Sequence, residues 1–220
     1  MKNGFKLFWT FVTAAKDEIL NDKKIYLNAF LWLVLLANID LFYPLLNIDE
    51  ESNTFLILNV VSALLTFVVL SQVVLIQKQK KGGSGQLKFF IPTFLLYNLY
   101  YSFFFFMGLL FLVIPAFYIL FYFSMAPLIA VLDDTNAGNY FSMSKALVKK
   151  NLPLVIWATL TNLLLELTSL ILNPIENPII SAIARFIFSI PDAFLSILMA
   201  VIMVKIYYEL KEVEVITESI

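Results

Sequence analysis

The chain has 220 residues, of which 61% are hydrophobic, 16% aromatic and only 14% charged, and its net charge is −1. This balance excludes a soluble globular domain and offers no basic surface for nucleic acid. Because the sequence contains no Cys and no His, disulfides, thiolate chemistry, haem, the usual zinc sites and His-dependent triads are excluded as well. The composition predicts an all-α polytopic membrane protein that forms a single helical domain over residues 1–220.

The first 24 residues predict an amphipathic helix. Apolar side chains recur at helical spacing, and charged side chains occupy the rest of the helical wheel. The apolar set is Phe5, Phe8, Trp9, Val12, Ile19 and Leu20. The segment lacks the unbroken apolar core and the cleavage site of a secretory signal peptide. We expect it to lie on the membrane surface and to anchor the amino terminus, with a lipid-sensing role as the alternative.

Six apolar segments follow, and the first five are close to the length of about 20 residues that crosses a bilayer as a helix. The expected crossings are residues 25–46, 55–76, 89–107, 115–132, 152–172 and 179–208. The third and fourth come from one run, Phe89 to Leu132, in which no side chain is charged. Gly108 and Pro115 are expected to bracket a tight reversal within that run.

The last apolar segment is longer than one crossing needs. As a single helix it would be about 45 Å long, which exceeds an untilted bilayer. Pro191 supplies a break. Two arrangements therefore remain open: one tilted, kinked helix, or a segment 179–190 that lies at the outer surface or re-enters while residues 191–208 cross.

Two connecting segments are rich in lysine. Residues 77–88 surround a glycine-rich stretch that lacks the preceding strand and the spacing of a P-loop, so we expect a flexible, solvated loop. Residues 137–151 predict a second interfacial amphipathic helix. Its apolar side would comprise Tyr140, Phe141, Ser144, Leu147 and Val148.

The basic residues predict the orientation of the chain. Lysines gather in the amino-terminal segment, the glycine-rich loop, the second interfacial helix and the tail, whereas Arg185 alone falls on the other side of the expected crossings. By the positive-inside rule both termini are cytoplasmic, and six crossings satisfy that parity.

Two opposite charges fall inside expected crossings. Glu166 lies about seven residues before the turn that follows the fifth crossing, and Arg185 about seven residues after it. A charged side chain in hydrocarbon costs about 2.5 to 3.5 kcal/mol on insertion scales, so we expect each of these two side chains to have a partner. We predict an intramembrane ion pair between them that pins this hairpin; a proton or ion relay and a lipid-headgroup contact are the alternatives.

Polar residues also form stripes along two crossings. The longer stripe, on the fifth crossing, follows spacings of three and four and comprises Thr159, Asn162, Glu166, Ser169 and Asn173. The shorter stripe, on the second crossing, comprises Asn59, Ser62 and Thr66. Such stripes hold helices together through interhelical hydrogen bonds, which is the interpretation we favour. Lining a polar cavity is the alternative.

The remaining acidic residues in apolar segments give little support to catalysis. Asp40 and Asp192 are expected near the outer interface, where a carboxylate costs less. They are the geometric candidates for aspartyl chemistry at a shared site, but neither lies in a motif for it. We therefore expect no catalytic residue, no metal site and no cofactor, and hence no enzyme.

A longer pattern runs from Gly108 to Lys150. The run Gly-Leu-Leu-Phe-Leu-Val-Ile-Pro-Ala-Phe-Tyr is followed by Met125-Ala126-Pro127, Val131, Asp133, Ser144, Leu147 and Val148-Lys149. This pattern resembles the YciC-like bacterial membrane proteins and the membrane domain attached to some bacterial glycerophosphodiester phosphodiesterases. The sequence departs from it at Ala116, where Gly is usual, and at Tyr140-Phe141, where Ala-Leu is usual. The resemblance covers about a fifth of the chain in detail.

The resemblance implies a six-helix protein of the bacterial inner membrane, with no catalytic residues to carry over. In the phosphodiesterase relatives the hydrolase domain would follow the membrane domain, beyond Ile220 here, so that activity is expected to be absent.

Three functions remain open. The first is a non-enzymatic multi-pass protein of the cytoplasmic membrane in envelope or lipid homeostasis, with membrane lipids, a membrane protein or a second copy as partner. The second is a small transporter or channel whose path follows the stripe on the fifth crossing. The third is an immunity or accessory protein that blocks a toxin in the membrane.

Overall fold

The computed structural model describes residues 2–43, 48, 52–83, 87–111, 113–133, 139–171 and 178–218. Side chains are described in these ranges except at residues 2–3, 40, 87–91, 111, 113, 165–171, 178–182 and 213–218. All regular secondary structure in the described part is helical, as the composition predicts. The elements are α1 (Lys2–Asn21), α2 (Lys23–Ala37), η1 (Ile39–Phe42), α3 (Asn53–Lys80), α4 (Leu87–Phe111), α5 (Val113–Tyr122), α6 (Ala126–Leu132), α7 (Tyr140–Lys150), α8 (Leu152–Ile171) and α9 (Pro178–Glu218).

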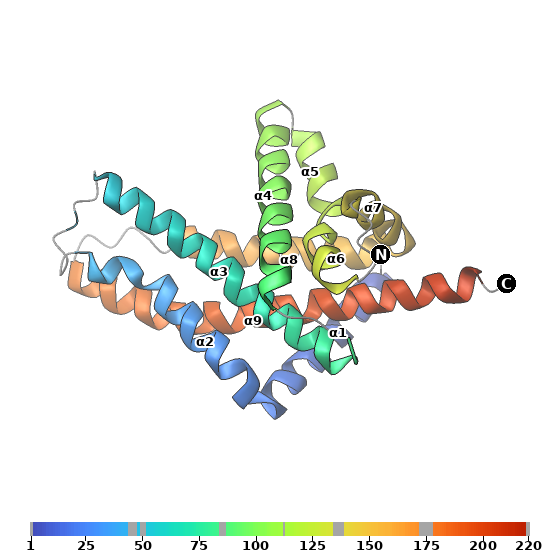
Figure 1. Cartoon of the computed structure of the whole chain (residues 1–220), viewed down its shortest axis with the longest axis horizontal. Coiled ribbons are helices and arrows are strands. Elements are labelled where there is room, and N and C mark those ends of the chain that lie inside the picture. The colour runs from blue at the N-terminus through green and yellow to red at the C-terminus, as the bar shows by residue number, and fades with distance from the viewer. Residues whose placement is uncertain are drawn as a thin grey trace.

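The longest helix, α9, is the element on which the others assemble. It extends along the molecule in Figure 1, and α1, α2, α3 and α8 pack along it. The helix is continuous from Pro178 to Glu218 with Pro191 in its interior. Of the two arrangements left open for the last apolar segment, the structure therefore has the single helix.

Four segments within the described residues are long and apolar enough to cross a membrane, judged by length and composition. They are Asn53–Lys80, Pro92–Leu110, Ile114–Leu132 and Ile183–Glu212. Residues 152–164 form a shorter apolar helix. The first expected crossing, residues 25–46, differs from its prediction, because α2 ends at Ala37 and a 3-10 turn follows.

The hairpin of α4 and α5 lies where the sequence predicts a reversal. In Figure 1 these two helices stand side by side and steeply to α9. A Cβ on Gly108 would lie 2.8 Å from the backbone N of Ala116, so only glycine permits this approach. The expected fourth crossing is divided, because α5 ends at Tyr122 and α6 begins at Ala126.

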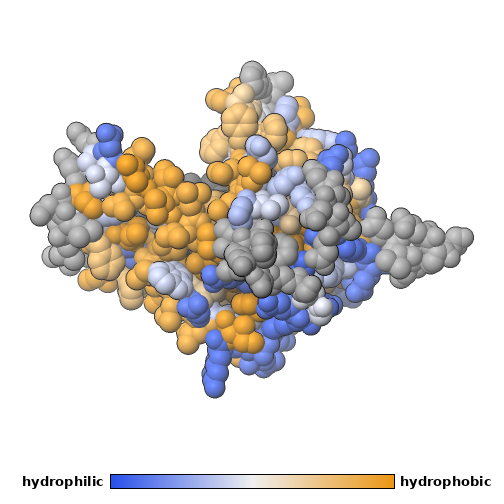
Figure 2. Space-filling model, viewed as in Figure 1, coloured by the Kyte–Doolittle hydropathy of each residue, from blue (hydrophilic) through white to orange (hydrophobic). Residues whose placement is uncertain are grey.

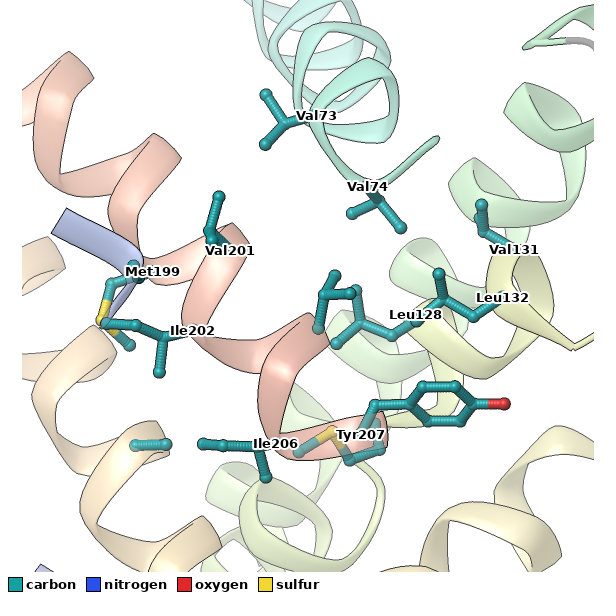
Figure 3. Close-up of a cluster of buried hydrophobic side chains, with 14 of the residues drawn as sticks. Val73, Val74, Leu128, Val131, Leu132, Met199, Val201, Ile202, Ile206 and Tyr207 are labelled. Carbon is teal, nitrogen blue, oxygen red and sulfur yellow. The ribbon is translucent and has the colours of Figure 1, made fainter. Parts of the chain in front are cut away.

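The densest part of the core lies where α3, α6 and α9 meet, shown in Figure 3. Every residue of α6 is buried. The side chains labelled in the figure are Val73 and Val74 from α3, Leu128, Val131 and Leu132 from α6, and Met199, Val201, Ile202, Ile206 and Tyr207 from α9. Close packing of this kind is a main source of stability between helices in a bilayer, where lipid is as apolar as the side chains.

The two amphipathic helices each turn one side to the bundle. α1 buries Gly4, Phe8, Ala15 and Ile19 and packs on α8 and α9, while Trp9 remains 60% exposed. On α7 the buried residues are Tyr140, Ser144, Leu147 and Val148. The Ser144 hydroxyl donates to the carbonyl of Tyr122 at 2.7 Å, which fixes α7 to the end of α5.

The lysine-rich segment after the second expected crossing is more ordered than predicted. α3 continues to Lys80, and Gly82 follows with a φ of 80°. The N–H of Gly82 donates to Gln79 and that of Gly83 to Lys78, which is the pattern of a Schellman motif. The prediction of a solvated loop is wrong for Lys78, which is 1% exposed and donates to the carbonyl of Val131 at 2.9 Å. This buried ammonium therefore satisfies a carbonyl in the last turn of α6.

Candidate functional site: a cavity between the helices

A cavity of about 470 Å³ lies between α3, α4, α6, α8 and α9. On the face drawn in Figure 2, apolar residues cover the α3 side and the α4–α5 hairpin, and the surface is hollowed between them. Hydrophilic residues gather on the lower right of this view, towards the side where α9 ends. The steep departure of α4 from the bundle leaves this space, since helices packed side by side along their length would fill it.

Aromatic rings of α4 form one wall of the cavity. Phe94, Asn98, Tyr101 and Phe105 lie along it at spacings of four, three and four, which place residues on one side of a helix, and Phe106 also reaches the lining. Phe103 and Phe104 are not part of the lining and are 58% and 44% exposed, and Phe106 is 64% exposed although it reaches the lining. The run of four phenylalanines is therefore divided between the cavity and the outer surface of the helix.

Polar side chains come from α4, which contributes Asn98 and Ser102, and from α8 and α9. Thr159 and Asn162, one turn apart on α8, both line the cavity, and so do Asp192 and Ser196 on α9. The Thr159 hydroxyl donates within its own helix, to the carbonyl of Val155 at 2.8 Å. The two members of the longer predicted stripe that the structure describes thus share one cavity wall with an acidic side chain from the neighbouring helix.

Asp192 is the acidic residue of the cavity lining. It follows Pro191, and none of the described residues that line the cavity is Lys or Arg. Within the described part of the chain, Asp192 forms no hydrogen bond or ion pair. The side chain of Asp40 lies outside the described residues, so a shared site for Asp40 and Asp192 stays a prediction.

The predicted ion pair between Glu166 and Arg185 also stays a prediction. Arg185 lies on the exposed side of α9, but the side chain of Glu166 lies outside the described residues. The same holds for Ser169, and Asn173 lies in a segment that is not described. Of the longer stripe, Thr159 and Asn162 are therefore the members placed by the structure.

The shorter stripe joins α3 to the end of α2. The Ser62 hydroxyl donates to the carbonyl of Leu36 at 3.2 Å, and Asn59 accepts from the Tyr43 hydroxyl at 3.3 Å. Nearby, the Asn38 amide donates to the Ser189 hydroxyl on α9 at 2.7 Å. The Ser62 contact is an interhelical hydrogen bond of the kind that the favoured interpretation requires. The Asn59 contact is to a residue that follows the turn after α2, and the Thr66 hydroxyl donates within α3, to the carbonyl of Ser62 at 3.0 Å.

A cluster of charged residues that the sequence analysis did not predict joins α1, α2, α3 and α9. The Glu18 carboxylate on α1 lies 2.7 Å from Lys80 through Oε1 and 2.7 Å from Lys205 through Oε2. Its Oε1 also accepts from Tyr26 at 2.9 Å and from Gln77 at 2.6 Å. Burial by itself raises the pKa of Glu18, but the four donors outweigh it and lower the pKa from 4.5 to about 2.

No local pattern could have revealed this cluster. Its members come from four segments far apart in the sequence, and each alone looks like an ordinary charge at the end of a helix. The cluster ties the helix ends together, and within the described residues no group of three or more acidic side chains could hold a metal ion.

The fold and the cavity together define a class of protein. It is an all-α protein with several long apolar helices that are compatible with a membrane. The helices line a space that is partly aromatic and partly polar. Comparisons of the chain with protein-family models, with curated proteins and with solved structures find no match.

Proposed function

We propose that this chain is a non-enzymatic, multi-pass protein of the bacterial cytoplasmic membrane that binds a membrane amphiphile in its cavity and acts in envelope or lipid homeostasis. The cavity carries the proposal. Its volume of about 470 Å³ and its mainly apolar lining, into which α4, α8 and α9 place polar side chains, have the form of a small-molecule site. Its walls belong to helices apolar enough to be embedded in lipid, so the molecules that reach it most readily are those dissolved in the bilayer.

The proposed topology has six crossings and cytoplasmic termini. It is supported by the lysines, which gather in the segments between alternate crossings, and by residues 152–164 of α8, which form an apolar helix shorter than the four candidate spans. In this arrangement α1 and α7 lie at the cytoplasmic interface. The exposed Trp9 and Phe5 of α1 suit that position, because aromatic rings favour the headgroup region.

We also propose that the chain is related to the YciC-like membrane proteins. The pattern from Gly108 to Lys150 supports this, and its glycine and its interfacial helix have clear structural roles. Gly108 permits the close approach of α4 and α5, and Ser144 fixes α7 against α5. The side chains that carry the resemblance thus organise the α4–α7 region rather than a reaction centre.

A small transporter is the second candidate. Thr159 and Asn162 line the cavity together with Asp192, so a polar path along α8 would begin in this space. The two candidates share the binding step and differ in whether the bound molecule crosses the membrane.

Native mass spectrometry of the protein released with its own lipids tests the proposal. The wild-type protein is expected to retain a membrane amphiphile, and Ala200→Phe, which places a ring in the cavity, is expected to lose it. The matched control is Ala14→Phe on the exposed side of α1, which should retain it. Equal retention by all three proteins would place the bound molecule elsewhere and refute the cavity as the site.

A further inference from the structure

The cavity lining combines aromatic rings with polar groups, and α4 contributes Asn98 and Ser102 as well as its rings. Phe94, Tyr101 and Phe105 of α4 present aromatic rings, whereas α9 contributes the carboxylate of Asp192. Ring faces carry negative potential, and the carboxylate carries a full negative charge when ionised. Both groups therefore attract positive charge into the same space.

No basic residue in the described lining compensates Asp192. Arg185 lies on the same helix, but seven residues of α-helix separate the two by about 10 Å along the axis. The other polar side chains of the lining are neutral hydroxyl or amide groups: Asn98, Tyr101, Ser102, Ser124, Thr159, Asn162 and Ser196. A carboxylate among apolar walls is costly when ionised unless a cation pairs with it.

An unpaired carboxylate beside aromatic rings is the arrangement that recognises quaternary ammonium and related cations. An anionic headgroup would meet repulsion from Asp192 and find no basic partner in the described lining. A neutral amphiphile would leave the carboxylate without a counter-charge. The apolar remainder of the cavity, which includes Phe67 and Leu70 of α3, suits an apolar body attached to the charge.

We propose that the cavity binds a hydrophobic monocation: a protonated or quaternary nitrogen, or a comparable onium centre, attached to an apolar body. The charge lies beside Asp192 and the apolar part against the rings of α4. This inference rests on the proposed function, because it names the class of amphiphile that the cavity takes. The ammonium of an aminolipid headgroup and a free hydrophobic amine share this chemistry.

The test measures equilibrium binding of tetraphenylphosphonium to the full chain in phosphatidylglycerol nanodiscs, with empty nanodiscs as the background. Tetraphenylborate, which has the same shape and the opposite charge, is the ligand control. The wild-type protein is expected to bind the cation in excess of the background and not the anion. Binding of both ions with equal affinity would overturn the inference.

Two variants of Asp192 test whether its charge binds the cation, and Phe105→Ala tests whether the rings of α4 do. Each test has a control variant at an exposed position. Asp192→Asn, which keeps the shape of the side chain, is expected to weaken binding by about tenfold or more, and Asp192→Glu to keep it within about threefold. Asp17→Asn, at an exposed position of α1, should leave affinity unchanged. Phe105→Ala is expected to weaken binding by about threefold or more, whereas Phe103→Ala on the outer side of α4 should not.

Adding phosphatidylethanolamine to the nanodiscs distinguishes the two sources of the natural ligand, an aminolipid and a free hydrophobic cation. Loss of tetraphenylphosphonium binding would show that an ammonium group, here part of a zwitterionic headgroup, competes for the place beside Asp192, whereas unchanged binding would leave the free hydrophobic monocation as the occupant.

Failure of this inference and failure of the proposed function give different experimental results. If Ala200→Phe abolishes tetraphenylphosphonium binding but Asp192→Asn does not, the cavity is a binding site and its preference for cations is refuted. If the wild-type protein retains an amphiphile in native mass spectrometry but binds no tetraphenylphosphonium, the inference fails and the proposed function stands. If neither is bound, both fail.

Discussion

Lys205 on α9 lies 2.7 Å from Glu18 on α1, so the last helix of the protein is tied by charge to the first. The same carboxylate also pairs with Lys80 at the end of α3, and all three side chains are largely shielded from solvent. One acidic residue thus joins the ends of α1 and α3 to α9 at a single point. Because the three segments are distant in sequence, this contact constrains the chain more than an ion pair within one helix would.

The first prediction concerns the removal of this charge. Glu18→Gln keeps the shape of the side chain but loses both ion pairs, and it leaves two half-buried ammonium groups without their shared partner. We expect a loss of about 2 kcal/mol in the free energy of unfolding, measured as a lower Tm in a mild detergent. The control is Asp17→Asn at the preceding, exposed position, where the expected change is within about 0.5 kcal/mol. Equal changes in the two variants would mean that the cluster contributes nothing specific.

The second prediction concerns pH. The pKa of Glu18 is lowered from 4.5 to about 2 in the folded protein, so the unfolded state binds a proton at a higher pH than the folded state does. The stabilisation is fully present above about pH 4.5 and is lost as the pH falls towards 2. We expect the difference in Tm between the wild-type protein and Glu18→Gln to narrow across that interval. A difference that stayed constant down to pH 2 would contradict the lowered pKa.

The third prediction concerns the buried ammonium group of α3. Lys78→Met keeps the apolar stem but removes the donor to the carbonyl of Val131 in the last turn of α6. An unsatisfied buried acceptor costs about 1 to 3 kcal/mol, so we expect a destabilisation of that size in thermal unfolding. Lys24→Met, at an exposed position of α2, serves as the control and should have little effect. Indistinguishable Tm values for the two variants would show that Lys78 has no structural role.

The fourth prediction concerns the hairpin of α4 and α5. Gly108→Ala would place a Cβ 2.8 Å from the backbone N of Ala116, and backbone atoms cannot yield as a flexible side chain can. We expect a loss of about 1 to 3 kcal/mol together with a wider separation of the two helices, measurable as a distance between spin labels on each. Leu110→Ala, two residues further on and 78% exposed, should leave that distance unchanged. An unaltered distance in Gly108→Ala would refute the close approach.

The fifth prediction concerns orientation. Because the wild-type sequence contains no Cys, single cysteines can be introduced without altering the background. Asn53→Cys, at the start of α3, is expected to react with a membrane-impermeant maleimide in intact cells. Lys149→Cys, at the end of α7, is expected to react only after permeabilisation. The reverse pattern would place the termini outside.

The sequence by itself determined the class of this protein and most of its helices. A run of apolar residues predicts a helix because the prediction depends only on residues that are adjacent in the sequence. Each run is long, uncharged and bounded by polar or proline-containing segments. The reversal between Gly108 and Pro115 and the buried side of α7 could be predicted for the same reason, since both depend on residues within one or two turns of each other. The hydrogen bonds of Ser62 and Asn59 follow from a polar stripe visible in the sequence.

Only the tertiary structure decided which helices meet and what lies between them. Lys78 and Lys80 are two residues apart, and the sequence assigns both to a solvated loop. In the structure Lys78 is buried and donates to a carbonyl in the last turn of α6, whereas Lys80 pairs with Glu18 of α1. The cavity contains Asp192 of α9 and Thr159 of α8, which the packing of these two helices brings into the same space. Periodicity specifies which side of a helix is apolar. The partner of that side depends on the packing of the whole bundle, and no local stretch of sequence contains that information.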